Sequence, residues 1–278
     1  MNALSPILAH LRGEPSRTWS LVVTMFGDAI VPRGGAVWLG TLLAFFRALD
    51  IGDGVVRTAM SRLAADGWLE RHRVGRNSFY RLADKGREDF RAASERIYAR
   101  HAPPWAGRLD LAIGSNRAVL EAAGFTALAP GVWVAAGGAG PVEGALRLTA
   151  FGDGETLRAL AARCWPQEAT AANYARFLAA FAPLRAALEQ GAVFTDQDAF
   201  AARILLIHEY RRIVLRESAL PLELLPQDWP GTAARELCAN VYGRLAVASE
   251  RWLDENAIGH DGAPLTAGVD VIARRFAP

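Results

Sequence analysis

The sequence is poor in the residues that mark several large protein classes. It has two cysteines, Cys164 and Cys238, which lie far apart and have no partner at CxxC spacing. They build neither a disulfide framework nor a zinc site, and we expect both to be buried as small apolar side chains in a reducing compartment. The five histidines do not follow the spacing of metal ligands. We therefore expect no metal and no cofactor.

Long apolar runs are also missing. No stretch approaches the ~20 apolar residues that a membrane span requires, and the first residues lack the charged lead and apolar core of a signal peptide. We therefore expect a cytoplasmic protein without a membrane partner. Hydrophobic residues still make up 51% of the 278 positions, which is enough for the cores of two or three domains.

Lysine is rare, and the cations are unevenly distributed. Lys85 is the only lysine among 31 basic residues, which fits either phosphate and carboxylate recognition or a genome rich in G and C. Residues 1–100 carry 15 basic and 10 acidic side chains, whereas the remaining 178 residues carry 16 and 19. A surface for nucleic acid is therefore expected only in the first hundred residues.

The most basic stretch, residues 53–85, predicts a helix followed by a hairpin. Asp53 is placed to cap the first turn of the helix, and Gly67 stands where a left-handed residue ends one. Residues 68–74 and 78–82 have the branched and aromatic composition of strands. The turn between them is assigned to Gly75, Arg76 and Asn77. The buried face of the helix, at the spacing i, i+3, i+4 and i+7, is formed by Val56, Ala59, Met60 and Leu63.

This stretch has the size and charge of a module that binds double-stranded DNA. From Arg57 to Lys85 there are seven basic and three acidic side chains. A helix with small, polar and cationic outer residues fits the major groove, where Arg57 and Arg62 can each donate two hydrogen bonds to a guanine edge. The arginines of the hairpin are assigned to phosphates. A solvated basic helix without a partner is the simpler alternative. The predicted DNA contacts are Arg57, Thr58, Ser61, Arg62, Arg71, Arg73, Arg76 and Asn77.

Two helices are predicted ahead of this stretch and one after it. The first covers residues 16–26 with Ser16 as its cap, and the glycines and proline of residues 27–35 then interrupt it. The second ends before Gly52, and a further helix runs from Asp84 to about Arg100. Three helices and a basic hairpin are the parts of a winged helix-turn-helix domain. The predicted apolar faces of the first two helices are Trp19, Val22, Val23 and Phe26, and Trp38, Leu42, Leu43, Phe45, Phe46 and Leu49.

The middle of the chain has a different pattern. Alternation predicts strands at residues 108–114, 131–135 and 145–151, and helices at residues 116–123 and 155–162. This order suggests a ferredoxin-like α/β sandwich whose fourth strand is not evident. The glycines between residues 137 and 144 are assigned to a hairpin connection, because they do not follow the pattern of a phosphate-binding loop.

The last third of the chain is predicted to be all-helical. Long helices are expected at residues 172–190, 195–217 and 232–256, with Pro221, Pro226 and Pro230 ending helices in the connector before the last one. The fold class is therefore α+β and multidomain. The expected boundaries, placed in part by Pro103 and Pro104, are 1–101 for the winged helix-turn-helix, 102–166 for the ferredoxin-like domain and 167–278 for the C-terminal helical domain.

Five segments spread over the chain resemble the PaaX family of repressors that control phenylacetic acid degradation. The resemblance implies a homodimeric transcriptional repressor that binds an inverted-repeat operator in DNA. It also implies release from DNA by an aryl-CoA thioester such as phenylacetyl-CoA. The matching segments are VVTMFGDAIVPRGG at 22–35, RTAMSRLAADGWLERHRVGRNSFYRLADKG at 57–86, APGVW at 129–133, ILLIHEYRRIVLRE at 204–217 and LPLELLPQDWPG at 220–231.

A group of polar residues on the apolar helix near residue 208 is a candidate effector site. In one hypothesis Arg211, Arg212 and Arg216 bind the phosphates of an acyl-CoA, with His208 or Tyr210 near the acyl group. In the other, the arginines form internal ion pairs that join the domains. A metalloprotease site is excluded, because Arg212 stands where the second histidine would be required.

Two other classes of function remain as alternatives. An enzyme acting on acyl-CoA thioesters would need a positioned nucleophile or base, and the chain has no GxSxG motif and no cysteine and histidine at motif spacing. A protein-binding module would show no salt-sensitive affinity for DNA. We therefore predict a DNA-binding regulator and not an enzyme.

Overall fold

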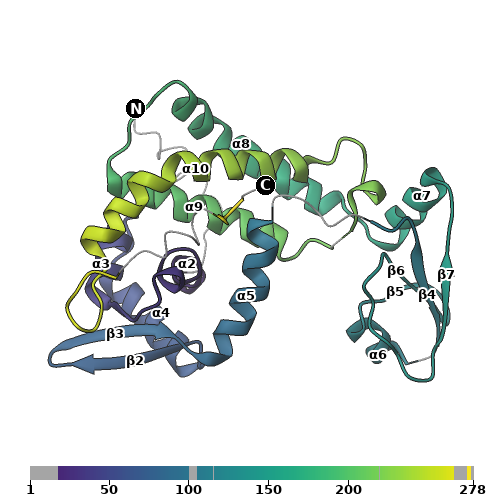
Figure 1. The fold of residues 1–278 in the computed structure, drawn as a ribbon, viewed down its shortest axis with the longest axis horizontal. Coiled ribbons are helices and arrows are strands. Elements are labelled where there is room, and N and C mark those ends of the chain that lie inside the picture. The colour runs from purple at the N-terminus through teal and green to yellow at the C-terminus, as the bar shows by residue number, and fades with distance from the viewer. Residues whose placement is uncertain (1–17, 100–104, 115, 219, 266–273, 277–278) are drawn as a thin grey trace. The chain divides into compact units, whose positions relative to one another are not determined.

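The computed structural model describes residues 18–99, 105–114, 116–218, 220–265 and 274–276. It contains helices and two small antiparallel sheets, which confirms the α+β class (Figure 1). Contacts divide the chain into two compact units. The first, which we call the helical unit, comprises residues 1–100, 174–216 and 232–278, and the second, the sheet unit, comprises residues 101–173 and 217–231.

The first part of the helical unit is a set of short helices followed by a three-stranded sheet. The sheet has the order β1-β3-β2, with both neighbouring pairs antiparallel. Its elements are α2 (Thr18–Met25), η1 (Phe26–Ile30), η2 (Val31–Arg33), β1 (Val37–Trp38), α3 (Leu39–Arg47), α4 (Asp53–Ala65), β2 (Leu69–Val74), β3 (Asn77–Leu82) and α5 (Asp84–Tyr98).

The glycine- and proline-containing segment does not interrupt the first helix where the sequence predicted. After α2 the backbone continues as a π-helical turn, η1, and then as a 3-10 turn, η2. Pro32 does not interrupt this helical path, because it lies in the first turn of η2, where its missing N–H is tolerated. The helical path ends at Gly34, whose φ of 72° is left-handed. The predicted cap, Ser16, lies outside the described residues.

Two tryptophans are not where the predicted apolar faces placed them. Trp19 is 36% exposed, because the buried stripe of α2 passes through Leu21, Val22 and Met25. Trp38 is 37% exposed and belongs to β1, so that α3 begins only at Leu39. The rest of the predicted face of the second helix is buried: Leu42, Leu43, Phe45, Phe46 and Leu49.

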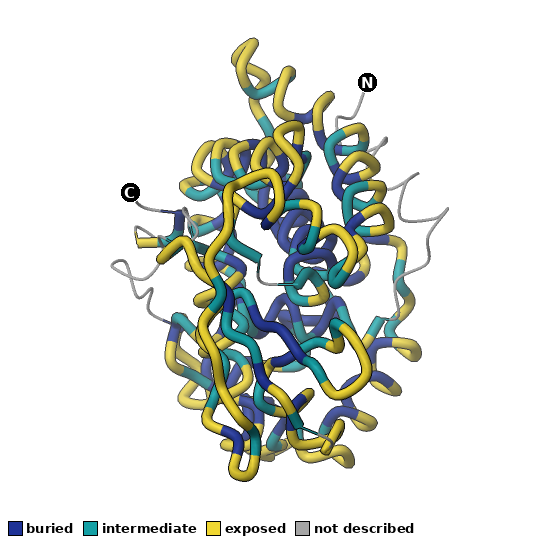
Figure 2. Tube along the Cα trace, turned by 90° about the vertical axis from the view of Figure 1, so that its right-hand side faces the viewer, coloured by how far each residue is buried: buried dark blue, intermediate teal, exposed yellow. Residues whose placement is uncertain are grey.

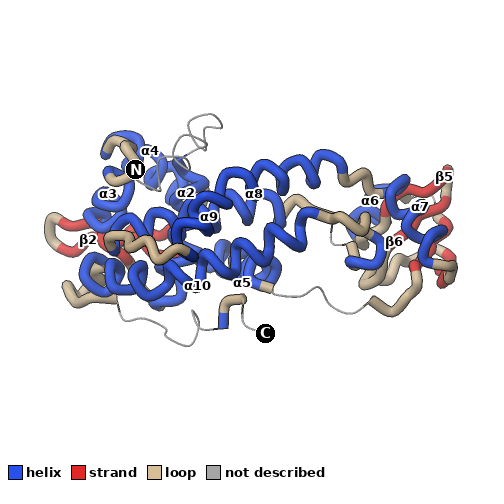
Figure 3. Tube along the Cα trace, turned by 90° about the horizontal axis from the view of Figure 1, so that it is seen from above, coloured by secondary structure: helices blue, strands red, loops and turns tan. Residues whose placement is uncertain are grey.

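Three long helices complete the helical unit, and their prediction from the sequence is confirmed. They are α8 (Glu168–Glu189), α9 (Asp196–Val214) and α10 (Pro230–Asn256), and they run side by side in Figures 1 and 3. Pro230 begins α10 and does not end a helix, since proline fits a first helical turn. The ring of Phe200 in α9 stacks on Trp252 of α10 at 4.5 Å and meets Phe45 of α3 edge to face at 5.0 Å. These C-terminal helices therefore share one core with the amino-terminal helices.

The sheet unit contains the fourth strand that the sequence did not reveal. Its sheet has the order β5-β6-β4-β7, and each neighbouring pair is antiparallel. The missing strand is β5, a four-residue edge strand, TALA, with an irregular register. The sequence did not predict β5, because the strand is short and consists largely of alanine. The elements are β4 (Leu109–Ile113), α6 (Arg117–Ala122), β5 (Thr126–Ala129), β6 (Val132–Ala135), β7 (Leu146–Ala150), α7 (Gly154–Cys164) and the 3-10 turn η3 (Leu222–Leu224).

The helices of the sheet unit, α6 and α7, cover opposite faces of its sheet. Trp133 of β6 packs in one core with Leu120 of α6. Its neighbour Val134 packs in a second core with Leu157 of α7. Successive side chains of one strand therefore pack in two different cores, one on each face of the sheet. Figure 2 shows the buried residues in dark blue. Cys164, at the end of α7, is only partly buried, contrary to prediction, because it ends a helix whose inner face is formed by earlier residues; Cys238 is buried as predicted.

Candidate nucleic-acid interface

The helix α4 has the two faces that the sequence predicted. All four apolar residues of the predicted inner face are buried, and Met60 is completely so. The helix ends at Ala65, and Gly67 then adopts a φ of 75°, as predicted for a left-handed residue after a helix. The inner face fixes α4 against the core, so the opposite face is held outward.

The start of α4 differs from the prediction. Gly52 occupies the capping position, and Asp53 lies inside the first turn without capping it. The carboxylate of Asp53 instead accepts two hydrogen bonds from Arg47 at the end of α3, from Nε at 2.8 Å and from Nη2 at 2.6 Å. A planar guanidinium binds a carboxylate in this two-bond geometry, and it competes with the backbone N–H groups for the same oxygens. The hydrogen bonds from Arg47, and to a smaller extent its charge, lower the pKa of Asp53. The ion pair between Arg47 and Asp53 therefore stabilises the turn between α3 and α4.

The outer face of α4 carries all four of the residues predicted to contact DNA. Arg57, Thr58, Ser61 and Arg62 are exposed. The hydroxyl of Thr58 donates to the backbone carbonyl of Gly54 at 2.9 Å. Nε of Arg62 lies 3.7 Å from a carboxylate oxygen of Asp66 one turn later, a loose and exposed pair.

The hairpin beside α4 in Figure 1 has a tighter turn than predicted. Val74 pairs with Asn77, so the turn contains only Gly75 and Arg76, and Asn77 is the first residue of β3. Gly75 has a φ of 59°, the conformation that a two-residue hairpin turn requires. Because the turn has two residues and not the predicted three, β2 and β3 form one residue pair more than predicted.

The hairpin presents cations at its tip and buries its other side. Arg73 and Arg76 are exposed, whereas Phe79 and Tyr80 of β3 are buried. Nη2 of Arg71 donates to Oγ of Ser78 across the hairpin at 2.8 Å. Within the described residues, the exposed arginines without an ion pair on α4 and the hairpin include Arg57, Arg73 and Arg76. All eight predicted DNA contacts are thus exposed on one helix and its neighbouring hairpin.

The predicted effector residues on α9 differ in how far they are buried. His208 and Tyr210 are completely buried. Nδ1 of His208 lies 2.9 Å from Oγ1 of Thr24 in α2. Burial, reinforced by the charges of Arg211 and Arg212, lowers the pKa of His208 well below its ordinary value of 6.5. At neutral pH the imidazole is therefore uncharged.

The three arginines of that segment have different surroundings. Arg211 donates to Oγ1 of Thr24 at 2.8 Å and to Oγ of Ser20 at 2.9 Å, and burial lowers its pKa to about 10. Nη1 of Arg212 lies 3.0 Å from a carboxylate oxygen of Glu209. The Arg212 side chain is 31% exposed, and Arg216 is exposed. Arg211 thus joins α9 to α2, while the other two reach solvent.

Comparison with known proteins decides the family. The family described as PaaX-like protein matches residues 17–86, and the one described as PaaX-like protein C-terminal domain matches residues 165–255. The transcriptional repressor PaaX of Escherichia coli (strain K12) is 35% identical over 95% of this chain and 93% of its own length. The chain belongs to the PaaX family. The resemblance found in the five segments is thereby confirmed, and the family is one of transcriptional regulators and not of enzymes.

A solved structure shares the fold of this PaaX-family chain. The uncharacterized protein Rv0674 from Mycobacterium tuberculosis superimposes with a TM-score of 0.56 at 22% identity, over 84% of this chain and 97% of that one. Among the described residues of the PaaX-family chain, no His, Cys, Asp and Glu side chains gather in a group of three or more that could hold a metal ion. The described helices include none that is long and apolar enough to cross a membrane.

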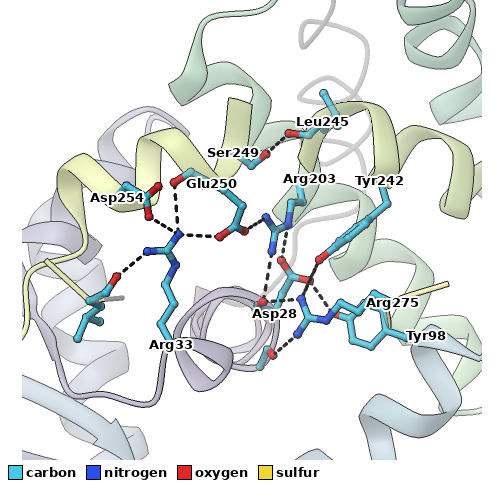
Figure 4. A network of polar contacts seen from close by, with 12 residues as sticks. Asp28, Arg33, Tyr98, Arg203, Tyr242, Leu245, Ser249, Glu250, Asp254 and Arg275 are labelled. Atoms are coloured by element: carbon cyan, nitrogen blue, oxygen red, sulfur yellow. Dashed lines mark hydrogen bonds and ion pairs between the residues drawn. The ribbon is translucent and has the colours of Figure 1, made fainter. Parts of the chain in front are cut away.

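Sequence reasoning missed a buried charged cluster in this PaaX-family protein, drawn in Figure 4. Its centre is Asp28 of η1, which is 1% exposed. Nε of Arg203 donates to Oδ2 of Asp28 at 2.8 Å, and Nη1 of Arg275 donates to Oδ1 at 2.8 Å. The hydroxyl groups of Tyr98 and Tyr242 donate to the same Oδ1 at 2.6 Å and 3.1 Å. One carboxylate therefore connects η1 with α5, α9, α10 and the C-terminal segment.

The electrostatics of the cluster keep Asp28 charged. Burial alone raises the pKa of a carboxyl group, but the charges of Arg203 and Arg275 together lower the pKa of Asp28 below its ordinary value. A second acid, Glu250 of α10, binds Arg203 and also lies 2.6 Å from Nη2 of Arg33. The sequence offered one signal for this cluster, since Asp28 and Arg203 are isolated charges within apolar segments.

Proposed function

We propose that this protein is a PaaX-type transcriptional repressor that binds double-stranded DNA through a winged helix-turn-helix. In this proposal α3 and α4 are the helix-turn-helix, α4 enters the major groove, and the β2–β3 hairpin is the wing. The observation that carries the proposal is the exposure of all eight predicted contact residues on the outer face of α4 and on the hairpin. The buried inner face of α4 leaves this surface free for a ligand.

The residues of this surface have different proposed roles. Arg57 and Arg62, on the helix, hydrogen-bond to base edges, with guanine as the preferred base, and Thr58 and Ser61 line the groove. Arg71, Arg73, Arg76 and Asn77 hold phosphates on either side. Arg71 is already oriented by Ser78, which lowers the entropy lost when it binds a phosphate.

The repressor is proposed to act as a homodimer on an inverted-repeat operator. The support is the resemblance to the PaaX family of repressors, together with a single helix of this type among the residues that the structure describes. A two-fold dimer places two such helices on half-sites about one helical turn, or a multiple of it, apart. We also propose the three domains expected from the sequence, of which the middle one is ferredoxin-like.

The operator is proposed to belong to an aromatic-acid catabolic operon, with an aryl-CoA thioester such as phenylacetyl-CoA as the effector that releases the protein from DNA. Arg212 and Arg216, which reach solvent at the end of α9, are the proposed contacts for the CoA phosphates. Arg211, His208 and Tyr210 lie behind them and link α9 to α2 and α10. An effector that favours a conformer with mismatched half-sites weakens DNA binding, and DNA weakens effector binding by the same factor.

A gel-shift series with the DNA upstream of the protein's own gene tests the proposal. We expect binding that falls on the order of a thousandfold between low and physiological salt, if ~6 or more phosphates are contacted. Phenylacetyl-CoA, but not free CoA, is expected to release the DNA. A variant carrying Arg57→Ala and Arg62→Ala should lose the preference for the operator over unrelated DNA. Equal binding to both DNAs by the wild-type protein would contradict the proposal.

A further inference from the structure

Val55 is an exposed apolar residue in the first turn of α4. It is 54% exposed, whereas the neighbouring Val56 is completely buried and anchors the helix to the core. A β-branched residue is a weaker helix former than the alanine or the straight-chain residues that a solvent-facing position would favour. Neither packing nor helix formation therefore accounts for valine at this position.

The position of Val55 on the helix relates it to the proposed DNA contacts. At about 100° per residue, Val55, Thr58 and Arg62 follow one another along one flank of the outer face. Arg57 lies on the opposite flank. Between the flanks, the centre of the outer face consists of small, exposed residues: Gly54, Ser61 and Ala65. Small residues at the centre let the helix backbone approach a groove closely.

The hydrogen-bonding capacity of this flank is restricted near the start of the helix. The hydroxyl hydrogen of Thr58 is donated to the carbonyl of Gly54 at 2.9 Å, so Thr58 offers only an acceptor and a methyl group. Val55 offers only methyl groups. At Val55 and Thr58 the flank therefore has no donor, and this part of it does not match the acceptor-rich major-groove edge of guanine. The apolar group that the major groove presents is the C5-methyl of thymine.

We propose that Val55 contacts the C5-methyl group of a thymine in each half-site, with the methyl group of Thr58 beside it, and thereby determines part of the operator sequence. The inference rests on the proposed function, because it requires α4 to lie in the major groove. The inference assigns different kinds of DNA contact to different residues of α4. The first turn selects thymine by apolar contact, and the arginines of the flanks bind guanine edges and phosphates.

The test pairs a protein variant with a DNA variant that each remove the same contact. The full-length protein first selects its preferred duplex from a random library, and each thymine of that duplex is then replaced by uracil, which lacks only the methyl group. We expect one or two uracil positions per half-site to weaken wild-type binding by about three- to fivefold, the effect of one buried methyl group. In Val55→Ala the same uracil should change affinity within about 1.5-fold, because the contact is already lost.

Two further variants keep the test interpretable. Val193→Ala, at a 96% exposed valine outside α4, should show the full uracil effect of the wild type. Val55→Thr keeps the branched shape and should show an intermediate effect. The inference is overturned if no thymine is sensitive to uracil, or if Val55→Ala loses as much affinity as the wild type on the same uracil. A protein that selects no sequence at all would instead overturn the proposed function.

Discussion

Nε of Arg203 lies 2.8 Å from Oδ2 of Asp28, and both side chains are completely buried. The pair joins α9 to η1, the π-helical turn that precedes α3 and α4. A buried ion pair repays its desolvation only when its remaining hydrogen-bonding groups are satisfied. Here Arg275, Tyr98 and Tyr242 satisfy the other oxygen of Asp28. This one carboxylate therefore contributes to holding η1, and the helices that follow it, against the C-terminal helices.

Replacing that carboxylate should strongly destabilise the helical unit. Asp28→Asn preserves the shape but removes the carboxylate that pairs with Arg275 and leaves Arg203 with Glu250 alone, which costs about 3–5 kcal/mol of unfolding free energy. Urea unfolding followed by circular dichroism measures the loss. Asp84→Asn, at an exposed acid that pairs with the exposed Arg87, is the matched control and should leave the midpoint almost unchanged. An Asp28→Asn protein as stable as the wild type would show that the cluster contributes nothing net.

The buried His208 predicts a loss of stability in mild acid. Its pKa is lowered in the folded protein, so below about pH 6.5 the unfolded chain binds a proton that the folded chain does not. Stability should therefore fall as the pH drops from 7 to 5, by up to about 1.4 kcal/mol per pH unit. Asp28 contributes in a different window: its folded pKa is lowered, so its stabilisation is lost only below about pH 4.

Urea unfolding at several pH values separates this histidine from the others. His208→Gln should flatten the slope between pH 7 and 5, even if the variant is less stable throughout. His72→Gln, at a histidine on the exposed side of β2, should retain the slope of the wild type. The assignment to His208 fails if its variant keeps the full slope.

The tip of the hairpin should contribute to DNA affinity through charge alone. Arg73→Ala and Arg76→Ala should each weaken binding to operator and unrelated DNA alike, and each should reduce the slope of log affinity against log salt by about one. Fluorescence anisotropy titrations at several salt concentrations measure the slope. Arg117→Ala, which removes an exposed arginine of α6, should leave it unchanged. Unchanged slopes for both hairpin variants would argue against phosphate contacts at the wing.

Two glycines should respond to alanine with opposite signs. Gly67, after α4, has a φ of 75°, where a Cβ atom is strained, so Gly67→Ala should cost about 1–2 kcal/mol. Gly243 is an exposed residue inside α10, where Gly243→Ala should stabilise by about 0.5–1 kcal/mol. Neither added Cβ meets another atom within 4 Å, so the difference isolates backbone conformation. Thermal unfolding of both variants measures it, and equal shifts would contradict the explanation.

Much of the fold was predictable wherever a repeating pattern decided the local structure. The inner face of α4 and the helices α8, α9 and α10 followed from apolar spacing, which is a property of neighbouring residues. Prediction failed where local signals competed. Asp53 has the composition of a cap, yet Arg47 binds its carboxylate. The edge strand β5 was too short to show a period, and it is fixed only by pairing with β6.

The sequence by itself determined which residues of α4 and the hairpin face outward, because amphipathic periodicity and turn chemistry act over a few residues. It also determined membership of the PaaX family, since the matching segments extend over most of the chain. Only the tertiary structure decided that Asp28 meets Arg203, 175 positions later, and that His208 and Tyr210 are buried. Buried charges are stabilised by partners that packing brings together from distant segments, and no local pattern encodes those partners.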